Sequence, residues 1–157
     1  MQLREATPSD IPAMLAIEQA ATSHPWTEAL FVSCFGNRYF NRVAVQSQPQ
    51  GDVIVGFYIG EYIAGEASLF DIAVHPSMQR LGIGRLLLQD FIEQAVRRGA
   101  EHLFLEVRES NSGAIALYEA VGFAEAGRRH NYYPHAKGFE DALLMCFDSA
   151  MLSMSAD

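Results

Sequence analysis

The segment DIAVHPSMQRLGIGRLLL, residues 71–88, decides how this chain folds, because it joins an apolar strand to an amphipathic helix through a turn with two glycines. The strand is the end of a longer apolar run at residues 64–74. From Gly82 to about Arg98 apolar residues recur at helical spacing and predict one buried stripe of Ile83, Leu86, Leu87, Phe91, Ile92 and Ala95. Gly99 follows at a position typical of a helix end. The segment therefore predicts a strand, a tight turn and a long helix.

The turn, QRLGIG at residues 79–84, lies where a helix N-terminus could bind a phosphate group. The first N–H groups of a helix lack partners and carry partial positive charge, and glycines let a bulky pyrophosphate approach them. Arg80 and Arg85 would add charged contacts. Two glycines alone leave a purely structural turn open as the alternative. A Rossmann fingerprint is excluded, because Leu87 stands where the third glycine is required, and a Walker loop lacks its Lys-Ser or Lys-Thr pair.

Upstream of this segment the sequence predicts a strand, two helices and an antiparallel meander. Hydroxyl residues and a proline at residues 7–10 are typical of a helix start, and Gly36-Asn37 would end the second helix in the left-handed conformation. The polar stretch SQPQG at residues 47–51 is hairpin-sized. The predicted strands are residues 3–6, 42–47, 52–60 and 64–74, and the predicted helices end near residue 19 and span residues 29–35.

Downstream of the long helix, strands and helices alternate. Alternation of this kind implies that some neighbouring strands are parallel. The polar and aromatic stretch RRHNYYP, residues 128–134, is predicted to form a hairpin loop. The predicted strands are residues 102–108, 122–127 and 141–147, and the helix between the first two spans residues 114–121.

The composition is that of one compact domain, with 157 residues of which 50% are apolar and 19% charged. We expect this domain to span residues 1–148, followed by a short C-terminal tail at residues 149–157. The N-terminus lacks the features of a signal peptide and no apolar stretch has membrane-spanning length, so we expect a cytoplasmic protein without membrane contacts. A net charge of -8 opposes direct nucleic-acid binding and favours basic partners. A monomer is the default expectation.

Cysteine and histidine indicate neither a disulfide framework nor a metal site. Cys34 and Cys146 stand far apart in apolar surroundings, which suits free buried thiols. The five histidines show no spacing typical of metal ligands. We therefore predict no metal.

Gln79, Gly82 and Gly84 fit the motif (Gln or Arg)-x-x-Gly-x-(Gly or Ala) of the GNAT acetyltransferases, and the sequence resembles that family from Met1 to about Phe147. The segments DIAVHPSMQRLGIGRLLL, LFLEVRESNSGAIALYEAVGF, RRHNYYP and EDALLM stand in family order. Together with HPWTE, they are most similar to the branch that acetylates the N-terminal alanine of a ribosomal protein. The resemblance implies the GNAT fold, an α+β (α/β) architecture with a mixed, mostly antiparallel sheet of six to seven strands, about four helices and central parallel strands that splay at the cofactor site.

The same resemblance implies acetyl-CoA as the cosubstrate. Backbone groups of Ile72, Ala73 and Val74 would dock its pantetheine arm and polarise the thioester carbonyl. Asn111 stands before a helix, so it is either a helix N-cap, a contact to the cofactor, or both. The loop that would hold the pyrophosphate comprises Arg80, Leu81, Gly82, Ile83, Gly84 and Arg85.

Glu106 interrupts an apolar strand, and alternation places it on the face opposite to Leu103, Leu105 and Val107. One interpretation is an ordinary solvated face on which Glu106 pairs with a neighbour. By resemblance, Glu106 occupies the position of the general base. An α-amine is mostly protonated at neutral pH, so it must lose a proton, directly or through water, before it attacks the thioester.

Tyr118 lies on the helix at residues 114–121, where it could simply join the apolar stripe of Ala114, Leu117 and Val121. By resemblance, it is the tyrosine that donates a proton to the departing thiolate. A phenol suits that task because its usual pKa, near ~10, exceeds that of a thiol, near ~8.5. No Cys, Ser or Lys has a recognisable activating base, so we expect direct transfer in a ternary complex without a covalent acetyl-enzyme.

The acceptor implied by the resemblance is the basic N-terminal peptide of small-subunit ribosomal protein eighteen, which begins with alanine. The acidity of the chain agrees with a basic peptide. Tyr132 and Tyr133 match positions in the wall of the family's peptide channel, and an ordinary polar loop is the alternative. A GNAT enzyme for small amines such as aminoglycosides or polyamines, and a noncatalytic acyl-CoA-binding regulator, remain open as other functions.

Overall fold

The computed structural model describes residues 1–135 and 137–148, and the predicted tail at residues 149–157 lies outside them. Seven strands form one mixed sheet in the order β1-β2-β3-β4-β5-β7-β6. The strands are β1 (Gln2–Glu5), β2 (Arg42–Gln48), β3 (Gly51–Ile63), β4 (Glu66–Val74), β5 (His102–Arg108), β6 (Ala124–His135) and β7 (Gly138–Asp148). The helices are α1 (Ile11–Ala21), α2 (Glu28–Ser33), α3 (Ile83–Arg97) and α4 (Ser112–Val121), with short 3-10 turns η1 (Pro8–Asp10) and η2 (Pro76–Met78).

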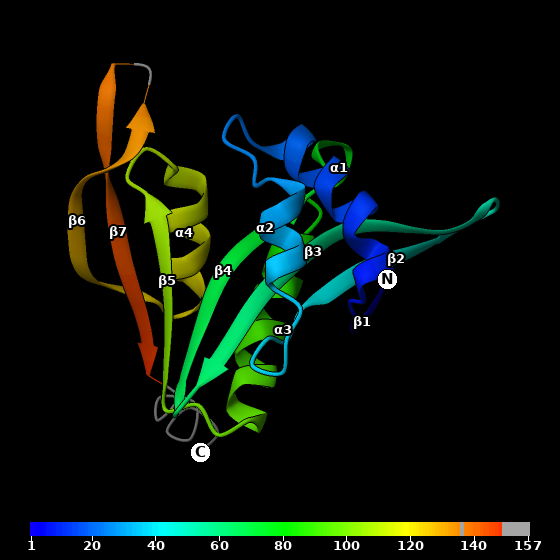
Figure 1. Ribbon diagram of the computed structural model, residues 1–157, viewed down its shortest axis with the longest axis horizontal. Coiled ribbons are helices and arrows are strands. Elements are labelled where there is room, and N and C mark those ends of the chain that lie inside the picture. Colours follow the sequence, from blue (N-terminus) through cyan, green and yellow to red (C-terminus); the bar gives the residue numbers. More distant parts are fainter. Residues whose placement is uncertain (136, 149–157) are drawn as a thin grey trace.

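The strands β4 and β5 pair over only four residues and then diverge, as Figure 1 shows. Their parallel register runs from Glu66 opposite His102 to Leu69 opposite Leu105. Phe70 is then an extra residue in β4, because the register with β3 shifts there, and such a bulge bends a strand. All other strand pairs are antiparallel. The predicted mixed sheet with splayed central parallel strands is confirmed.

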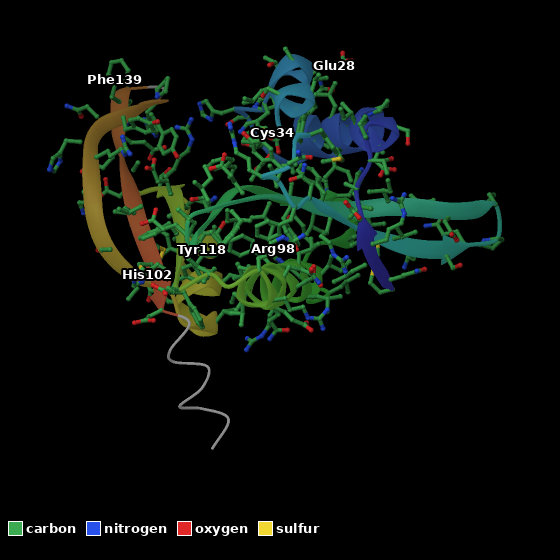
Figure 2. The ribbon with its side chains drawn as sticks, turned by 60° about the horizontal axis from the view of Figure 1, so that its bottom comes forward. Glu28, Cys34, Arg98, His102, Tyr118 and Phe139 are labelled. Atoms are coloured by element: carbon green, nitrogen blue, oxygen red, sulfur yellow. The ribbon has the colours of Figure 1, made fainter. Side chains whose placement is uncertain are left out.

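Each face of the sheet carries its own apolar core. On one face α1 and α2 pack over β2 and β3, and on the other α3 and α4 cover β3 to β5. Figure 2 shows Cys34 between α2 and the sheet and Tyr118 on the opposite side. Both cysteines are free, as predicted, and Cys34 is buried while Cys146 is half-buried. None of the described helices combines the length and apolar character needed to cross a membrane.

Two details of the predicted helices are wrong. The second helix ends at Ser33, and neither Gly36 nor Asn37 adopts the left-handed conformation. On α3, Leu86 is exposed although it fits the apolar periodicity, and Leu88 is fully buried in its place. The covered face of α3 is set by its position against the sheet, whereas its ends follow the sequence: Gly82 and Gly99 have φ values of 83° and 92°.

The predicted hairpin loop at residues 128–134 is also wrong, because this stretch is part of β6. It pairs with β7 through Arg129 opposite Ala142 and Tyr133 opposite Glu140, with a bulge between them that contains Asn131 at a φ of 53°. The polar composition reflects an edge strand that is mostly exposed, and main-chain pairing rather than side-chain burial holds it in the sheet.

Candidate active site

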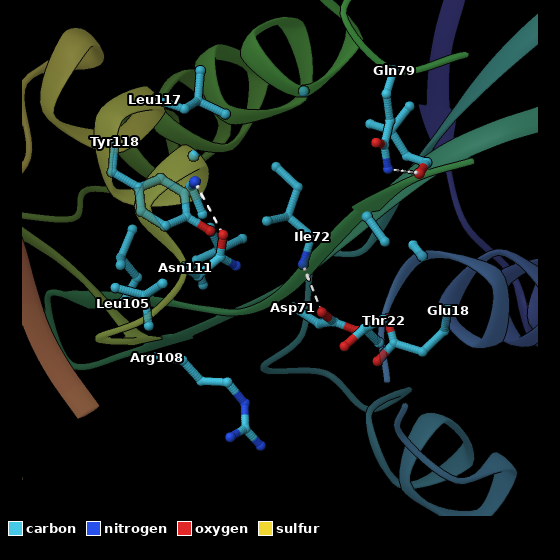
Figure 3. A pocket seen from close by; sticks show the side chains of 18 of the residues that line it. Glu18, Thr22, Asp71, Ile72, Gln79, Leu105, Arg108, Asn111, Leu117 and Tyr118 are labelled. Carbon is cyan, nitrogen blue, oxygen red and sulfur yellow. Dashed lines mark hydrogen bonds between the residues drawn. The ribbon is translucent and has the colours of Figure 1, made fainter. Parts of the chain in front are cut away.

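A cavity of about 620 Å³ opens where β4 and β5 separate. It runs from the start of α3, along the free edge of β4, to α1 and the end of β6. Figure 3 shows side chains of α1, β4, β5 and α4 projecting into this one space. The cleft therefore joins a helix N-terminus, an unpaired strand edge and titratable side chains from distant parts of the sequence.

The helix end of the cleft is built from main-chain groups. The first helical hydrogen bond of α3 joins Leu86 N–H to the Gly82 carbonyl, so the earlier N–H groups have no helical acceptor. Arg80 and Gly82 both have positive φ values, 66° and 83°, which turn the chain into the helix. A Cβ on Gly84 would lie 3.5 Å from Leu117, which is an ordinary van der Waals contact. Packing therefore does not require a glycine here, and the missing side chain leaves space in the cleft. This end fits a pyrophosphate.

Gln79 ties this loop to the strand edge. Its Nε2 donates a hydrogen bond to the Val74 carbonyl over 3.2 Å. Ile72, Ala73 and Val74 pair with β3 on one side, and beyond Leu69 the parallel ladder to β5 has ended, so their other edge faces the cleft. An extended cofactor arm could pair with this edge as an added strand does.

Glu106 reaches the cleft from β5 and is about one quarter exposed. As the alternation predicts, Leu103, Leu105 and Val107 are buried on the opposite face. Glu106 Oε1 forms an ion pair with Arg129 Nε over 2.8 Å. The structure thus shows the predicted pairing with a neighbour, and it also places the Glu106 side chain in the cleft.

Tyr118 is almost fully buried, and its ring packs against Phe123 with 6.2 Å between centroids. It belongs to the apolar core and lines the cleft at once (Figure 3). Burial, and then electrostatic interaction with Asp71 and Tyr133, raise the pKa of Tyr118 above its ordinary value. The hydroxyl therefore keeps its proton at neutral pH.

Asn111 caps α4, because its Oδ1 accepts a hydrogen bond from Ala114 N–H over 3.2 Å. The N-cap interpretation is confirmed. Asn111 also lines the cleft, where its amide group is within the same space as Tyr118 (Figure 3).

At the far end of the cleft, Tyr133 forms part of the wall and Tyr132 does not. The Arg108 guanidinium stacks on the Tyr133 ring, 4.4 Å from its centroid, and donates to the Pro134 carbonyl over 2.7 Å. Arg108 is also bonded to Glu140 over 3.0 Å. Tyr132 is half exposed and packs against Arg129. Only one of the two predicted tyrosines therefore faces the cleft.

Residues 11–123 of the chain match the acetyltransferase (GNAT) family. The chain belongs to the GNAT acetyltransferases. Enzymes of this family take their acetyl group from acetyl-CoA. The α3 loop and the free edge of β4 have a geometry that such an extended, pyrophosphate-containing cofactor could occupy.

Several GNAT acetyltransferases are similar to this chain in sequence or in structure. The [ribosomal protein bS18]-alanine N-acetyltransferase of Salmonella typhimurium is 46% identical over 143 residues, which cover 91% of this chain and 94% of that protein. The enzyme of the same name from Haemophilus influenzae is 40% identical over 137 residues, covering 87% and 90%. The crystal structure of the ribosomal-protein-S18-alanine N-acetyltransferase from Escherichia coli has a TM-score of 0.88 at 44% identity and covers 94% of this chain and 92% of that one.

Most residues predicted for the GNAT site lie together, and a few lie at its margin. Leu81, Gly82 and Arg85 do not line the cleft, and Leu81 and Arg85 are exposed. Among the described residues there is no group of three His, Cys, Asp or Glu side chains placed to hold a metal, and the predicted absence of a metal stays a prediction. The predicted residues that do line the cleft are Ile72, Ala73, Val74, Arg80, Ile83, Gly84, Glu106, Asn111, Tyr118 and Tyr133.

Two acidic residues of this GNAT cleft were missed by sequence reasoning, Glu18 on α1 and Asp71 on β4. A signal for both was present. Glu18 follows Ile11 and Met14 on the buried stripe of α1, and Asp71 stands between Phe70 and Ile72 in an apolar strand. Charged residues at such positions are rarely buried without a partner. Their proximity could not be foreseen, because 52 residue positions separate them along the chain.

Proposed function

We propose that this chain transfers the acetyl group of acetyl-CoA to the N-terminal alanine of ribosomal protein bS18. The observation that carries the proposal is the placement of Glu106 and Tyr118 in one cleft, between the free edge of β4 and a wall formed by α1 and Tyr133. The 46% identity to a bS18-alanine N-acetyltransferase supports the choice of acceptor. We propose that the single domain at residues 1–148 carries the whole activity, and a ribosomal acceptor puts the reaction in the cytoplasm.

The cofactor half of the site orients the thioester. N–H groups at the start of α3, with Arg80, bind the pyrophosphate, and the edge formed by Ile72, Ala73 and Val74 pairs with the pantetheine arm. The wider loop contributes Leu81, Gly82, Ile83, Gly84 and Arg85, of which the arginine adds charge from the exposed rim. Asn111 contacts the arm beside its capping role. These contacts fix the carbonyl carbon in reach of the amine.

Glu106 removes the proton that the incoming α-ammonium carries at neutral pH, directly or through a water molecule. The free amine then attacks the thioester carbon in a ternary complex, and the carbon–sulfur bond breaks as the amide bond forms. For this step the Glu106 carboxylate must separate from Arg129, whose side chain is mostly exposed.

Tyr118 donates its proton to the departing CoA thiolate. Its raised pKa keeps the phenol protonated until the sulfur develops negative charge, and the resulting thiol cannot attack the new amide. The ring is held by Phe123, so the hydroxyl direction is fixed by packing before substrate binds.

The acceptor half suits a basic peptide. Glu18, Asp71 and Glu106 line the cleft, and the chain as a whole carries a charge of -8. Tyr133 offers a flat surface for the first peptide bonds, and Tyr132 extends it outside the cleft.

The test is acetyl transfer to a synthetic peptide with the N-terminal sequence of bS18, read by mass spectrometry. The controls are the same peptide with a blocked N-terminus and an added internal lysine, a peptide with N-terminal serine, and a polyamine. We expect acetylation only of the free α-amine, and preferentially of alanine. Modification of the polyamine without the peptide contradicts the proposal, as does binding of acetyl-CoA with no transfer at all.

A further inference from the structure

Glu18 and Asp71 form a buried carboxyl pair that takes no part in the proton transfers described above. Glu18 is 2% exposed, and its Oε2 accepts a hydrogen bond from Trp26 N–H over 3.0 Å. Asp71 Oδ1 accepts one from Ile72 N–H over 2.9 Å. Asp71 Oδ2 is buried and has no donor among the described residues. Figure 3 shows the two carboxyl groups facing each other at the α1 side of the cleft.

This arrangement requires one shared proton. Two ionised carboxylates offer only acceptors to each other, whereas a protonated one donates a hydrogen bond to its neighbour. No basic side chain pairs with either group within residues 1–135 and 137–148. Burial raises the pKa of Asp71 well above its usual range, and so do the charge and hydrogen bond of Glu18, while the Ile72 N–H acts in the opposite direction. When the proton is on Asp71 Oδ2, which has no other partner among the described residues, this oxygen donates a hydrogen bond to the Glu18 carboxylate.

The pair joins the two halves of the cleft. Through Trp26 N–H, Glu18 holds the segment between α1 and α2, residues 22–27, whose members Thr22, His24 and Trp26 line the acceptor side. The Trp26 ring packs on Phe31, with 5.3 Å between centroids. Asp71 directly precedes the strand edge at Ile72. A contact between the two carboxyls therefore fixes the acceptor wall relative to the cofactor edge.

Other titratable and charged groups face the same space from every neighbouring element. Tyr118 comes from α4, Tyr133 from β6, Glu106 and Arg108 from β5, His24 from the segment after α1, and Arg80 from the loop before α3. The charge of Asp71 acts on Tyr118, so the two groups are close enough to interact. Any pH dependence of this pair must therefore be separated from that of the groups around it.

We propose that Asp71 is a positioning residue for the acceptor, which acts by sharing one proton with Glu18 and so keeps the segment at residues 22–27 against β4. Loss of that proton brings two negative charges into contact, and the segment moves away from the strand edge. Binding of the acceptor weakens, and binding of acetyl-CoA at the other end of the cleft does not. The inference deepens the proposed function, since it concerns how a peptide α-amine reaches that same site.

The first experiment needs no substrate. Trp26 is the only tryptophan in the chain, and it sits on the segment that the pair holds, so its fluorescence reports the position of the segment. In Asp71→Asn an amide N–H donates to Glu18 at every pH, which replaces the proton without changing shape. We expect a fluorescence transition with rising pH in the wild type that is absent in Asp71→Asn. Burial raises the pKa of Tyr118 in both proteins, so this neighbouring group keeps its proton while the carboxyl pair titrates.

The second experiment measures steady-state kinetics with the bS18 peptide from about pH 6 to 10. If only the protonated pair binds the acceptor, the peptide KM of the wild type rises relative to Asp71→Asn by up to about tenfold per pH unit above the transition. The ratio of the kcat values and that of the acetyl-CoA KM values stay constant with pH. Ionisation of the peptide amine affects both proteins equally, and burial, the largest cause of the raised Tyr118 pKa, is the same in both.

Two further variants complete the design. Asp52→Asn makes the same chemical change on the exposed β2–β3 hairpin and should behave as the wild type. Glu18→Gln offers an amide donor from the other side of the pair, and replaces Asp71→Asn if that variant fails to fold.

The outcomes separate the two proposals. Identical fluorescence titrations of the wild type and Asp71→Asn overturn the shared proton, and a KM ratio that does not change with pH overturns the positioning role. A wild type that acetylates no α-amine overturns the proposed function, and the fluorescence comparison then still decides whether the pair holds the segment.

Discussion

The two ends of the cleft are built in different ways. The end that we propose binds the cofactor is formed by main-chain groups from one continuous stretch, residues 72–85, and its features are local: a strand edge, a left-handed turn and a helix start. The end that we propose binds the acceptor is lined by side chains of α1, β4, β5 and β6, which meet only in the folded sheet. The comparison teaches that substitutions at the cofactor end should act through backbone conformation. Those at the acceptor end should act through charge and contact.

The largest effect is expected from Tyr118→Phe, at the point where both ends meet. The ring still packs on Phe123, but the proton for the thiolate is lost, so kcat should fall by roughly 100- to 1000-fold. The dissociation constant of acetyl-CoA, measured by calorimetry, should change by less than about twofold. An unchanged kcat removes Tyr118 from the mechanism and leaves only its core role.

Glu106→Gln should lower kcat with the peptide by roughly 100-fold, because an amide cannot accept the amine proton. The matched variant is Arg129→Gln, which removes the ion-pair partner and leaves the carboxylate in place. Steady-state kinetics should show a much smaller loss for Arg129→Gln than for Glu106→Gln. Equal losses in the two variants would instead favour a structural ion pair.

Comparison of Tyr133→Ala with Tyr132→Ala tests where the acceptor end of the cleft stops. Tyr133 lines the cleft and Tyr132 lies outside it, so the peptide KM should rise by about tenfold for the former and about twofold or less for the latter. The KM of acetyl-CoA serves as the control in both variants. A larger effect of Tyr132→Ala would place the peptide along the outside of β6.

A smaller effect is expected from Gly82→Ala at the cofactor end. The added Cβ meets nothing within 4 Å, so the cost arises from the φ of 83° alone, about 1 kcal/mol, which corresponds to roughly a fivefold weaker affinity for acetyl-CoA if the loop relaxes. Gly65→Ala is the matched control, since Gly65 has a similar φ of 86°, its Cβ would also be unobstructed, and the residue does not line the cleft. It should lower the melting temperature slightly and leave affinity unchanged.

The smallest effect concerns stability at the acceptor end. The pKa of Asp71 is raised in the folded chain, so the folded state keeps a proton that the unfolded chain releases near its ordinary value of ~4. The stabilisation is complete below that value and is lost as pH rises through the folded pKa. The melting temperature of the wild type should therefore fall relative to that of Asp71→Asn as the pH rises. Parallel curves for the two proteins contradict this.

Local sequence predicted most of the fold and of the cofactor end. The long helix with its two flanking glycines, the N-cap Asn111 and the alternation around Glu106 depend on neighbours within a few residues, and all were found where the pattern puts them. The resemblance to the GNAT family further indicated the roles of Glu106 and Tyr118. That their side chains enter one cleft is a fact of the structure, and their roles stay a proposal.

The predictions that failed concern where a segment lies relative to others. Residues 128–134 have the composition of a loop, yet β7 supplies main-chain partners that make them a strand, and Leu86 follows the helical period but faces away from the sheet. The sequence by itself determined the local elements, their order and the family, because these depend on short-range pattern and motif. Only the tertiary structure decided that Tyr133 faces the cleft, that Arg129 pairs with Glu106, and that Glu18 meets Asp71. Such contacts depend on how strands from distant parts of the chain align, which no local pattern records.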